Sequence, residues 1–182
     1  MEEFNQKIIL TDYINGLDKP IKMAEIGVWK GHATKHLLKD KNCGGNIKEY
    51  WAIDRWNLLP KEYGRMHNRT MEDWDKMYWY VCQLILWFPH LHVLRMDSDV
   101  AAEMFPDGYF DLVFIDADHY YEPTKADIET WLPKVKKDGV LTGHDYGNKR
   151  HPGVEKAVKE AFGNDYYVPE GGYVWIHRVS GH

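Results

Sequence analysis

The amino-acid sequence predicts an α/β protein with a doubly wound, mostly parallel sheet. Short apolar runs alternate with segments of helical periodicity, the pattern of parallel strands joined by crossover helices. The run FDLVFIDA at 110–117 is nearly continuous in apolar residues, as expected of a strand covered on both faces. At 166–178, two β-rich runs flank Gly171-Gly172, which indicates a terminal hairpin. We therefore expect the sheet to end in an antiparallel pair.

The first half of the chain supplies three of the predicted strands and two helices. The apolar runs that predict strands lie at 21–28, 50–54 and 91–97. A helix is expected to start within 31–39, directly after the first strand. Apolar residues recur at three- and four-residue steps over 72–88, which predicts a long, buried helix. The polar segment 55–73 is interpreted as a lid or as part of a substrate pocket.

The second half supplies the fourth and fifth strands, at 110–117 and 139–145. The helix between them contains Ile128 and Trp131, and Pro133 should kink or shorten it because proline lacks the amide hydrogen that a helix needs. A further helix is expected at 154–162, before the terminal hairpin.

Bulk composition narrows the class of protein. A chain of 182 residues suits one domain, 1–182, and its net charge of -5 argues against a nucleic-acid partner. The two cysteines, Cys43 and Cys82, form no CxxC pair, which favours a reduced intracellular protein. The N-terminus is acidic, and no apolar run is long enough to cross a membrane. We expect a cytoplasmic protein without a membrane segment, and the high aromatic content leaves a homodimer open.

Acidic and imidazole side chains follow two of the predicted strands. Asp116, Asp118 and His119 come at the end of the fourth strand, and His144 and Asp145 at the end of the fifth. The carboxyl ends of parallel strands meet at one edge of the sheet, where ligands bind. Both groups are therefore expected to serve one site.

The first predicted strand ends in a glycine-containing turn, Glu25-Ile26-Gly27-Val28-Trp29-Lys30-Gly31. Glycines allow a sharp turn and close approach of a ligand. Asp54, at the end of the second strand, is placed to accept hydrogen bonds from ribose hydroxyls. The third glycine of a dinucleotide motif is missing, and Glu25 would repel phosphates but suits a cationic amino or sulfonium group. An adenosine ligand without a pyrophosphate is thus favoured over NAD(P), although an oxidoreductase or an ordinary strand-turn-helix remains an alternative.

The motifs AEIGVWKG, YWAID, FDLVFIDADHYYE and DGVLTGHDYG resemble the class I S-adenosylmethionine-dependent methyltransferases. They are most similar to the small-molecule O-methyltransferase branch that includes the catechol, caffeoyl-CoA and macrocin enzymes. The resemblance implies a Rossmann-like sheet of seven strands with the last one antiparallel. It also implies methylation of a hydroxyl group on a small molecule or sugar, with S-adenosylmethionine as cofactor. A non-catalytic relative that keeps the fold is the alternative.

The resemblance also assigns roles to particular positions. It places the methionine part of the cofactor against Glu25, Gly27, Val28 and Gly31, the ribose at Asp54, the adenine edge at Asp97 and Ser98, and the amino group or a metal at Asp116. From the residues alone, Asp97 or Ser98 could equally cap the next helix.

The metal-dependent branch implies a divalent cation (Mg, Mn or Zn) held by Asp116, His144 and Asp145. The family has an Asp-Asp or Asp-Asn pair after the fifth strand, where this chain has His144-Asp145. An imidazole suits zinc, iron or manganese better than magnesium, which prefers oxygen ligands.

Two catalytic routes follow from the acid and imidazole groups. An acceptor hydroxyl must lose its proton, either to a general base or through coordination to a metal. His119 or His144 could be the base, with a neighbouring carboxylate such as Asp118 orienting the ring or sharing the proton. Alternatively, a bound cation acidifies the hydroxyl, and both routes stay open.

Overall fold

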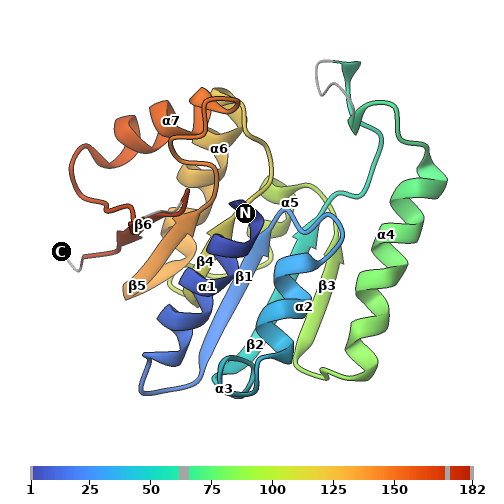
Figure 1. Ribbon diagram of the computed structural model, residues 1–182, viewed down its shortest axis with the longest axis horizontal. Helices are drawn as coiled ribbons and strands as arrows, with labels where there is room; N and C mark the ends of the chain where they lie inside the picture. The colour runs from blue at the N-terminus through green and yellow to red at the C-terminus, as the bar shows by residue number, and fades with distance from the viewer. Residues whose placement is uncertain (1, 62–65, 171–172, 181–182) are drawn as a thin grey trace.

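Six strands form one sheet in the order β3-β2-β1-β4-β5-β6 within the part of the chain that the computed structural model describes (Figure 1). It describes residues 2–61, 66–170 and 173–180, with side chains from residue 9 onward. The first five strands are parallel and β6 runs antiparallel to β5. The strands are β1 (Ile21–Ile26), β2 (Ile47–Asp54), β3 (Leu91–Arg95), β4 (Phe110–Ile115), β5 (Val135–Gly143) and β6 (Trp175–Arg178).

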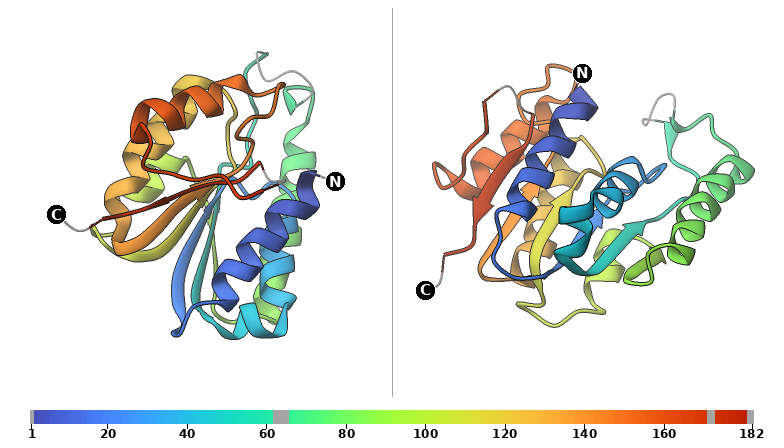
Figure 2. Two further views of the ribbon diagram at one scale, coloured as in Figure 1. Left: turned by 60° about the vertical axis from the view of Figure 1, so that its left-hand side comes forward. Right: turned by 60° about the horizontal axis from the view of Figure 1, so that its bottom comes forward.

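Helices cover both faces of this sheet, as Figure 2 shows. One face carries α1 (Glu2–Asn15), α2 (His32–Lys39), α3 (Lys41–Gly45) and α4 (Met71–Gln83), which continues into the 3-10 helix η2 (Leu84–Leu86). The other carries α5 (Ser98–Ala102), α6 (Tyr121–Trp131) with the 3-10 helix η3 (Leu132–Lys134), and α7 (Pro152–Phe162). This arrangement confirms the predicted α/β fold with a mostly parallel sheet.

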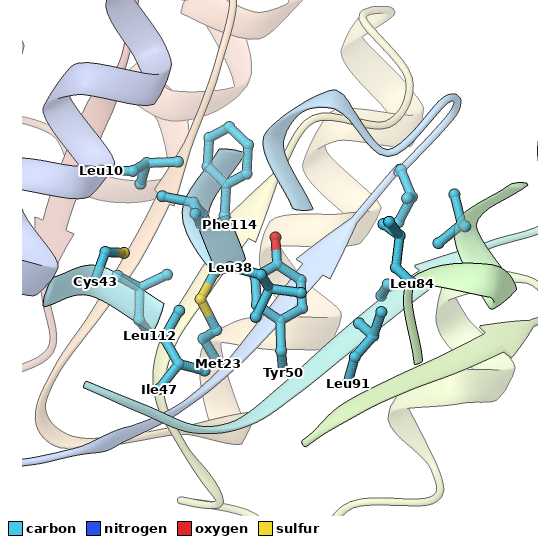
Figure 3. Packing of buried hydrophobic residues seen from close by; sticks show 14 of the residues in the cluster. Leu10, Met23, Leu38, Cys43, Ile47, Tyr50, Leu84, Leu91, Leu112 and Phe114 are labelled. Atoms are coloured by element: carbon cyan, nitrogen blue, oxygen red, sulfur yellow. The ribbon is translucent and has the colours of Figure 1, made fainter. Parts of the chain in front are cut away.

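The two faces are built from alternate residues of the central strands. In β4, Leu112 and Phe114 join the cluster under α1, α2 and α4, whereas Val113 and Ile115 join the cluster under α5, α6 and α7. Successive side chains of a strand point to opposite faces, so an unbroken apolar run fits a strand that is covered twice. Figure 3 shows Phe114 and Leu112 packed with Met23 and Tyr50 in the first cluster.

The local predictions hold with small shifts at the boundaries. The α6 helix ends at Trp131, directly before the 3-10 turn that contains Pro133, so the proline shortens the helix as expected. The long helix predicted at 72–88 is α4 followed by η2. The predictions did not include α1 or α3.

The implied count of seven strands is wrong for the described residues. The run at 166–168 forms no named strand, and Tyr167 contributes only an isolated antiparallel bridge to Ile176. Pro169 follows, and without an amide hydrogen it cannot extend that ladder. The antiparallel end is present because β6 pairs with β5. The turn predicted at Gly171-Gly172 lies outside the described residues.

Both cysteines are free, as predicted. Burial raises the pKa of the Cys43 thiol to about 12, so this side chain packs as a small apolar group in the first cluster. None of the helices that the structure describes is both long and apolar enough to cross a membrane.

Candidate active site

A cavity of about 1060 Å³ lies at the carboxyl ends of the central strands. The glycine-containing turn after β1 forms one wall, and the polar ends of β4 and β5 form another. Every predicted site residue except Gly31 lines this cavity, namely Glu25, Gly27, Val28, Asp54, Asp97, Ser98, Asp116, Asp118, His119, His144 and Asp145. The two predicted groups therefore share one space.

The flanks of the segment 55–73 also reach the cavity. Leu59 and Met66 line it, and His67 contacts the carbonyl oxygen of Leu59 at 2.7 Å through Nδ1. Residues 62–65 lie outside the described residues, so closure of this segment as a lid stays a prediction.

The turn after β1 depends on its two glycines. Gly27 has φ 87° and donates its amide hydrogen to the carbonyl of Ile53 at 2.9 Å. A side chain there would collide with the backbone of Asp116 and Ala117. Gly31, at φ 67°, caps α2 and packs against Val81. Gly31 thus shapes the turn without lining the cavity.

Glu25 is a buried carboxyl group at the end of β1, with only 2% of the residue exposed. Its Oε2 accepts hydrogen bonds from the hydroxyls of Thr34 at 2.5 Å and Tyr50 at 2.6 Å. Burial raises its pKa to about 8 despite these two hydrogen bonds. A cationic partner in the cavity would reverse that shift and favour the carboxylate.

Asp54 fastens the turn after β1 to the end of β2. Its Oδ2 accepts hydrogen bonds from the amides of Val28 at 2.9 Å and Trp29 at 2.8 Å, and its Oδ1 accepts one from Trp56 at 2.8 Å. Burial raises its pKa, and these amide donors oppose the rise. A carboxylate oxygen accepts more than one hydrogen bond, so these contacts leave capacity for a ligand hydroxyl.

The end of β3 leads into a buried network at the start of α5. The hydroxyl of Ser98 donates to Oδ1 of Asp127 at 2.6 Å and accepts from Nε1 of Trp131 at 2.7 Å. Burial raises the pKa of Asp127 to about 6. Asp97 is exposed and pairs with Arg55 at 3.2 Å, without capping α5 through its side chain. Sequence reasoning missed Asp127, although an acid between the buried positions Thr124 and Ile128 was a usable signal.

The ends of β4 and β5 bring two carboxylates and two imidazoles together. Nε2 of His119 lies 2.7 Å from Oδ2 of Asp145 and 3.6 Å from Oδ1 of Asp116. Nδ1 of His144 lies 3.4 Å from the same Asp145 oxygen and 3.6 Å from the same Asp116 oxygen. The predicted convergence of the two strand ends is thus present in the structure.

The carboxylates control protonation in this cluster. Burial lowers the pKa of each imidazole, but Asp116 and Asp145 outweigh that effect and raise it to about 10 for His119 and about 9 for His144. The pKa of Asp145 falls correspondingly, because the imidazoles outweigh its burial. With no cation bound, these shifts favour the protonated form of both rings.

Three neighbours that sequence reasoning left out shape this cluster. Asn148 is buried and donates from Nδ2 to Oδ1 of Asp145 at 2.6 Å. The His151 ring lies 4.3 Å from the His119 ring, centroid to centroid. Gly153 permits this contact, since a Cβ there would lie 2.5 Å from the amide nitrogen of Tyr121. The sequence HPG at 151–153 was interpreted as a turn before a helix, and Pro152 does begin α7.

Asp118 lies on the cavity wall beside this cluster. Its Oδ1 accepts a hydrogen bond from the amide of Tyr120 at 3.0 Å, and its carbonyl accepts one from the Thr124 hydroxyl at 2.9 Å. These contacts hold the loop before α6, and the hydrogen bond that described residues make to the Asp118 carboxylate ends on Oδ1, which leaves Oδ2 for a ligand in the cavity.

A sheet with this strand order and a ligand cavity at its carboxyl edge defines a doubly wound α/β fold, and the sequence assigns the family. Residues 24–146 match the family described as a methyltransferase domain, so the chain belongs to that family. The resemblance to class I S-adenosylmethionine-dependent methyltransferases is thereby confirmed, and S-adenosylmethionine is the cofactor expected of the family.

One curated relative is the uncharacterized protein y4gI of Sinorhizobium fredii (strain NBRC 101917 / NGR234). It is 26% identical over 136 residues, which is 73% of this chain. The chain spans only 14% of the length of that relative. The similarity therefore concerns one part of a much larger protein.

Solved structures share the fold at low sequence identity. The O-methyltransferase NovP is 16% identical with a TM-score of 0.71, over 99% of this chain and 80% of that one. CalS11, a TDP-rhamnose 3'-O-methyltransferase of calicheamicin biosynthesis, is 18% identical with a TM-score of 0.65, over 96% of this chain and 79% of that one. The CurJ carbon methyltransferase is 14% identical with a TM-score of 0.60, over 100% of this chain and 54% of that one. These likenesses show the fold alone because the identities are low, and the three structures comprise two O-methyltransferases and one carbon methyltransferase.

Proposed function

We propose that this protein transfers the methyl group of S-adenosylmethionine to a hydroxyl group of a small molecule or sugar. The observation that carries this proposal is one cavity with Glu25 and Asp54 on one side. On the other side lie Asp116, His119, His144 and Asp145, which we call the His–Asp cluster. Small-molecule sites usually occupy roughly 300–1,000 Å³. A cavity of about 1060 Å³ therefore has space for a cofactor together with an acceptor.

Cofactor recognition is assigned to the walls formed by β1, β2 and β3. Both hydrogen bonds that described residues make to the Glu25 carboxyl end on Oε2, which leaves Oε1 for the cofactor's amino group. Asp54 keeps acceptor capacity for ribose hydroxyls. Asp97 and the Ser98–Asp127 pair provide polar groups for the adenine edge. The turn after β1 lacks the third glycine of a dinucleotide motif, which favours an adenosyl sulfonium over NAD(P).

The acceptor hydroxyl is assigned to the His–Asp cluster. Methyl transfer is an in-line displacement, so much of the rate acceleration comes from holding the hydroxyl in line with the sulfonium. Asp118 lies on the cavity wall beside the cluster and is our proposed proton acceptor. His119 and His144 place positive charge, or a metal, beside the oxygen that develops negative charge.

A divalent cation fits the donors Asp116, His144 and Asp145. The facing atoms lie 3.4–3.6 Å apart, and the three residues form a group that could hold a metal ion. When bound, such a cation would lower the pKa of a coordinated hydroxyl. The imidazole contributes by favouring a metal with affinity for nitrogen.

Calorimetry with S-adenosylmethionine and, separately, with NAD tests the cofactor assignment. We expect binding of the sulfonium and none of NAD. Binding of NAD alone would overturn the proposal. A second assay incubates the protein with S-adenosylmethionine and a library of hydroxyl-bearing acceptors, with and without a chelator, and detects S-adenosylhomocysteine by mass spectrometry. Cofactor binding without turnover on any acceptor would instead favour a non-catalytic relative.

A further inference from the structure

Four donor atoms at the ends of β4 and β5 form a closed ring of neighbouring contacts. They are Oδ1 of Asp116, Nδ1 of His144, Oδ2 of Asp145 and Nε2 of His119. Going round the ring, neighbouring atoms are separated by 3.6, 3.4, 2.7 and 3.6 Å. Each atom thus faces two others, and His119 closes a ring that the three predicted ligands leave open.

The contact between His119 and Asp145 has the length of a hydrogen bond but not its geometry. Nε2 of His119 is fully buried and has no hydrogen-bond partner among the described residues, although Oδ2 of Asp145 is 2.7 Å away. Nε2 of His144 is likewise buried and unpaired, on a side chain that is only 10% exposed. Unpaired buried polar atoms are rare and costly in proteins. The unpaired Nε2 of His119 faces the ring of donors and indicates that a bound group completes its contacts, whereas Nε2 of His144 lies on the opposite side of the imidazole from Nδ1 and says nothing of this site.

The surroundings hold the four donors in place. Asn148 binds the other oxygen of Asp145 at 2.6 Å, which turns Oδ2 toward the imidazoles. Asp145 itself has φ 62°, a strained conformation for a residue with a side chain. The ring of His151 packs at 4.3 Å against that of His119, centroid to centroid, and one of its nitrogens lies within 4.8 Å of ligand atoms of His119 and Asp145. Hydrogen bonds that orient metal ligands are typical of built metal sites.

The spacing and chemistry of the donors favour a transition metal. Tetrahedral ligands at about 2.0–2.2 Å from zinc lie about 3.3–3.6 Å apart. Three of the four spacings in the ring, 3.4, 3.6 and 3.6 Å, match this value. Magnesium demands oxygen ligands in near-octahedral geometry, with neighbours about 2.9 Å apart, and it retains water. Two imidazoles among four donors fit magnesium poorly.

We infer that His119 is a metal ligand, and that the site binds a nitrogen-preferring transition-metal dication such as Zn²⁺ or Co²⁺ through Asp116, His119, His144 and Asp145. This inference rests on the cation assigned to the site in the proposed function. It deepens that assignment by adding a fourth ligand and by naming the class of metal. His119 is then a ligand and does not act as the catalytic base.

The test is metal binding to the tag-free, chelator-treated and dialysed protein, followed by calorimetry and by visible absorption. We expect one Co²⁺ or Zn²⁺ per chain, with Mg²⁺ binding at least about 100-fold more weakly. The bound Co²⁺ should show the intense visible bands of a four- or five-coordinate site. In His119→Gln, affinity for Co²⁺ should fall at least about 10-fold and the bands should change, because a ligand is lost.

Two controls make the result specific. His36→Ala removes an imidazole of α2 that does not line the cavity, and it should leave Co²⁺ binding unchanged. Far-UV circular dichroism and urea denaturation show that His119→Gln is folded, whether or not the protein binds S-adenosylmethionine.

The inference and the proposed function fail in different ways. If the protein binds S-adenosylmethionine but no Zn²⁺ or Co²⁺, or binds Mg²⁺ equally well, the metal inference is overturned and the methyltransferase proposal stands. An unchanged Co²⁺ spectrum in His119→Gln overturns the role of His119. If Co²⁺ binds through His119 while S-adenosylmethionine does not bind, the proposed function fails and the metal site stands.

Discussion

Gly27 and Ala117 approach so closely that a Cβ at position 27 would lie 2.4 Å from Cα of Ala117. The contact joins the end of β1 to the end of β4, and therefore joins the cofactor wall of the cavity to the His–Asp cluster. It exists because Gly27 has no side chain and adopts φ 87°.

Replacing Gly27 by alanine should separate these two strand ends. We expect Gly27→Ala to lower the free energy of unfolding by about 2 kcal/mol or more, because the collision is with backbone and the φ angle is strained as well. Urea denaturation measures the loss, and calorimetry should show loss of S-adenosylmethionine binding. In Gly45→Ala the new methyl group meets nothing within 4 Å, so that variant should match the wild type. Equal stability of both variants would contradict the proposed contact.

Glu25 should make the stability of the cofactor-free protein depend on pH. Burial raises its pKa in the folded protein to about 8 from an ordinary 4.5. Its contribution to the free energy of unfolding is therefore fully present below pH 4.5 and is lost as pH rises through 8. The Glu25→Gln variant has no carboxyl group to titrate at this position, so its stability does not fall with pH for this reason. The variant should gain stability relative to the wild type across that window, by at most about 1.4 kcal/mol per pH unit, and should bind S-adenosylmethionine more weakly.

Urea denaturation at several pH values measures this difference, and Glu49→Gln is its control. Partial burial tends to raise the pKa of Glu49, but hydrogen bonds from Tyr109 and Lys22 lower it to about 2. Its removal should therefore leave the pH dependence between 5 and 8 unchanged. A parallel pH profile for Glu25→Gln and the wild type would show that Glu25 does not titrate in this range.

Asp54 should matter both for the turn after β1 and for the cofactor. In Asp54→Asn one oxygen becomes an amide donor, so at least one of the three amide contacts at positions 28, 29 and 56 is lost. We expect a loss of about 1–3 kcal/mol in unfolding free energy together with weaker S-adenosylmethionine binding. Asp107→Asn removes only an exposed pairing with Lys134 and should change neither quantity. Full cofactor affinity in Asp54→Asn would contradict the ribose assignment.

Ser98 should act mainly through the buried network that it completes. Ser98→Ala leaves Nε1 of Trp131 and the carboxyl of Asp127 without their shared partner, so we expect a loss of about 1–3 kcal/mol in thermal or urea unfolding. Ser180→Ala, at an exposed position, is the matched control. If stability is unchanged while S-adenosylmethionine affinity falls, Ser98 contacts the adenine directly and the structural role is wrong.

Much of the fold and of the site could be predicted because the signals are local. The apolar run of β4 and the charged residues that follow it predicted a covered strand with a ligand edge, and Asp116 and His144 do meet there. Gly27 was predicted to be a site residue because it lies in the turn that follows the first strand. Pro133 predicted the end of α6 because proline lacks the amide hydrogen that a helix needs.

The remaining features depend on contacts between distant segments. Nothing near Asn148 or His151 in the sequence indicates that α7 packs against α6 through Gly153 and brings both residues to the cluster. Asp54 was expected to face a ligand, and only the folded turn shows that it also binds three amides. The α1 helix escaped prediction because its apolar residues show almost no helical amphipathicity. The run at 166–168 forms no named strand, because only Tyr167 bridges to Ile176 and Pro169 has no amide hydrogen with which to continue the pairing.

The close approach of β5 to its neighbours has a consequence for how this protein could diversify. A Cβ at Gly143 would lie 2.6 Å from the carbonyl oxygen of Ile115 and 2.7 Å from the indole of Trp175. Strand ends locked by such backbone contacts tolerate few substitutions. Under the proposed function, new acceptor preferences would then arise in the connecting segment 55–61, from which Arg55 and Leu59 line the cavity. Directed evolution of this chain should accordingly concentrate its libraries on that stretch and leave the strands alone.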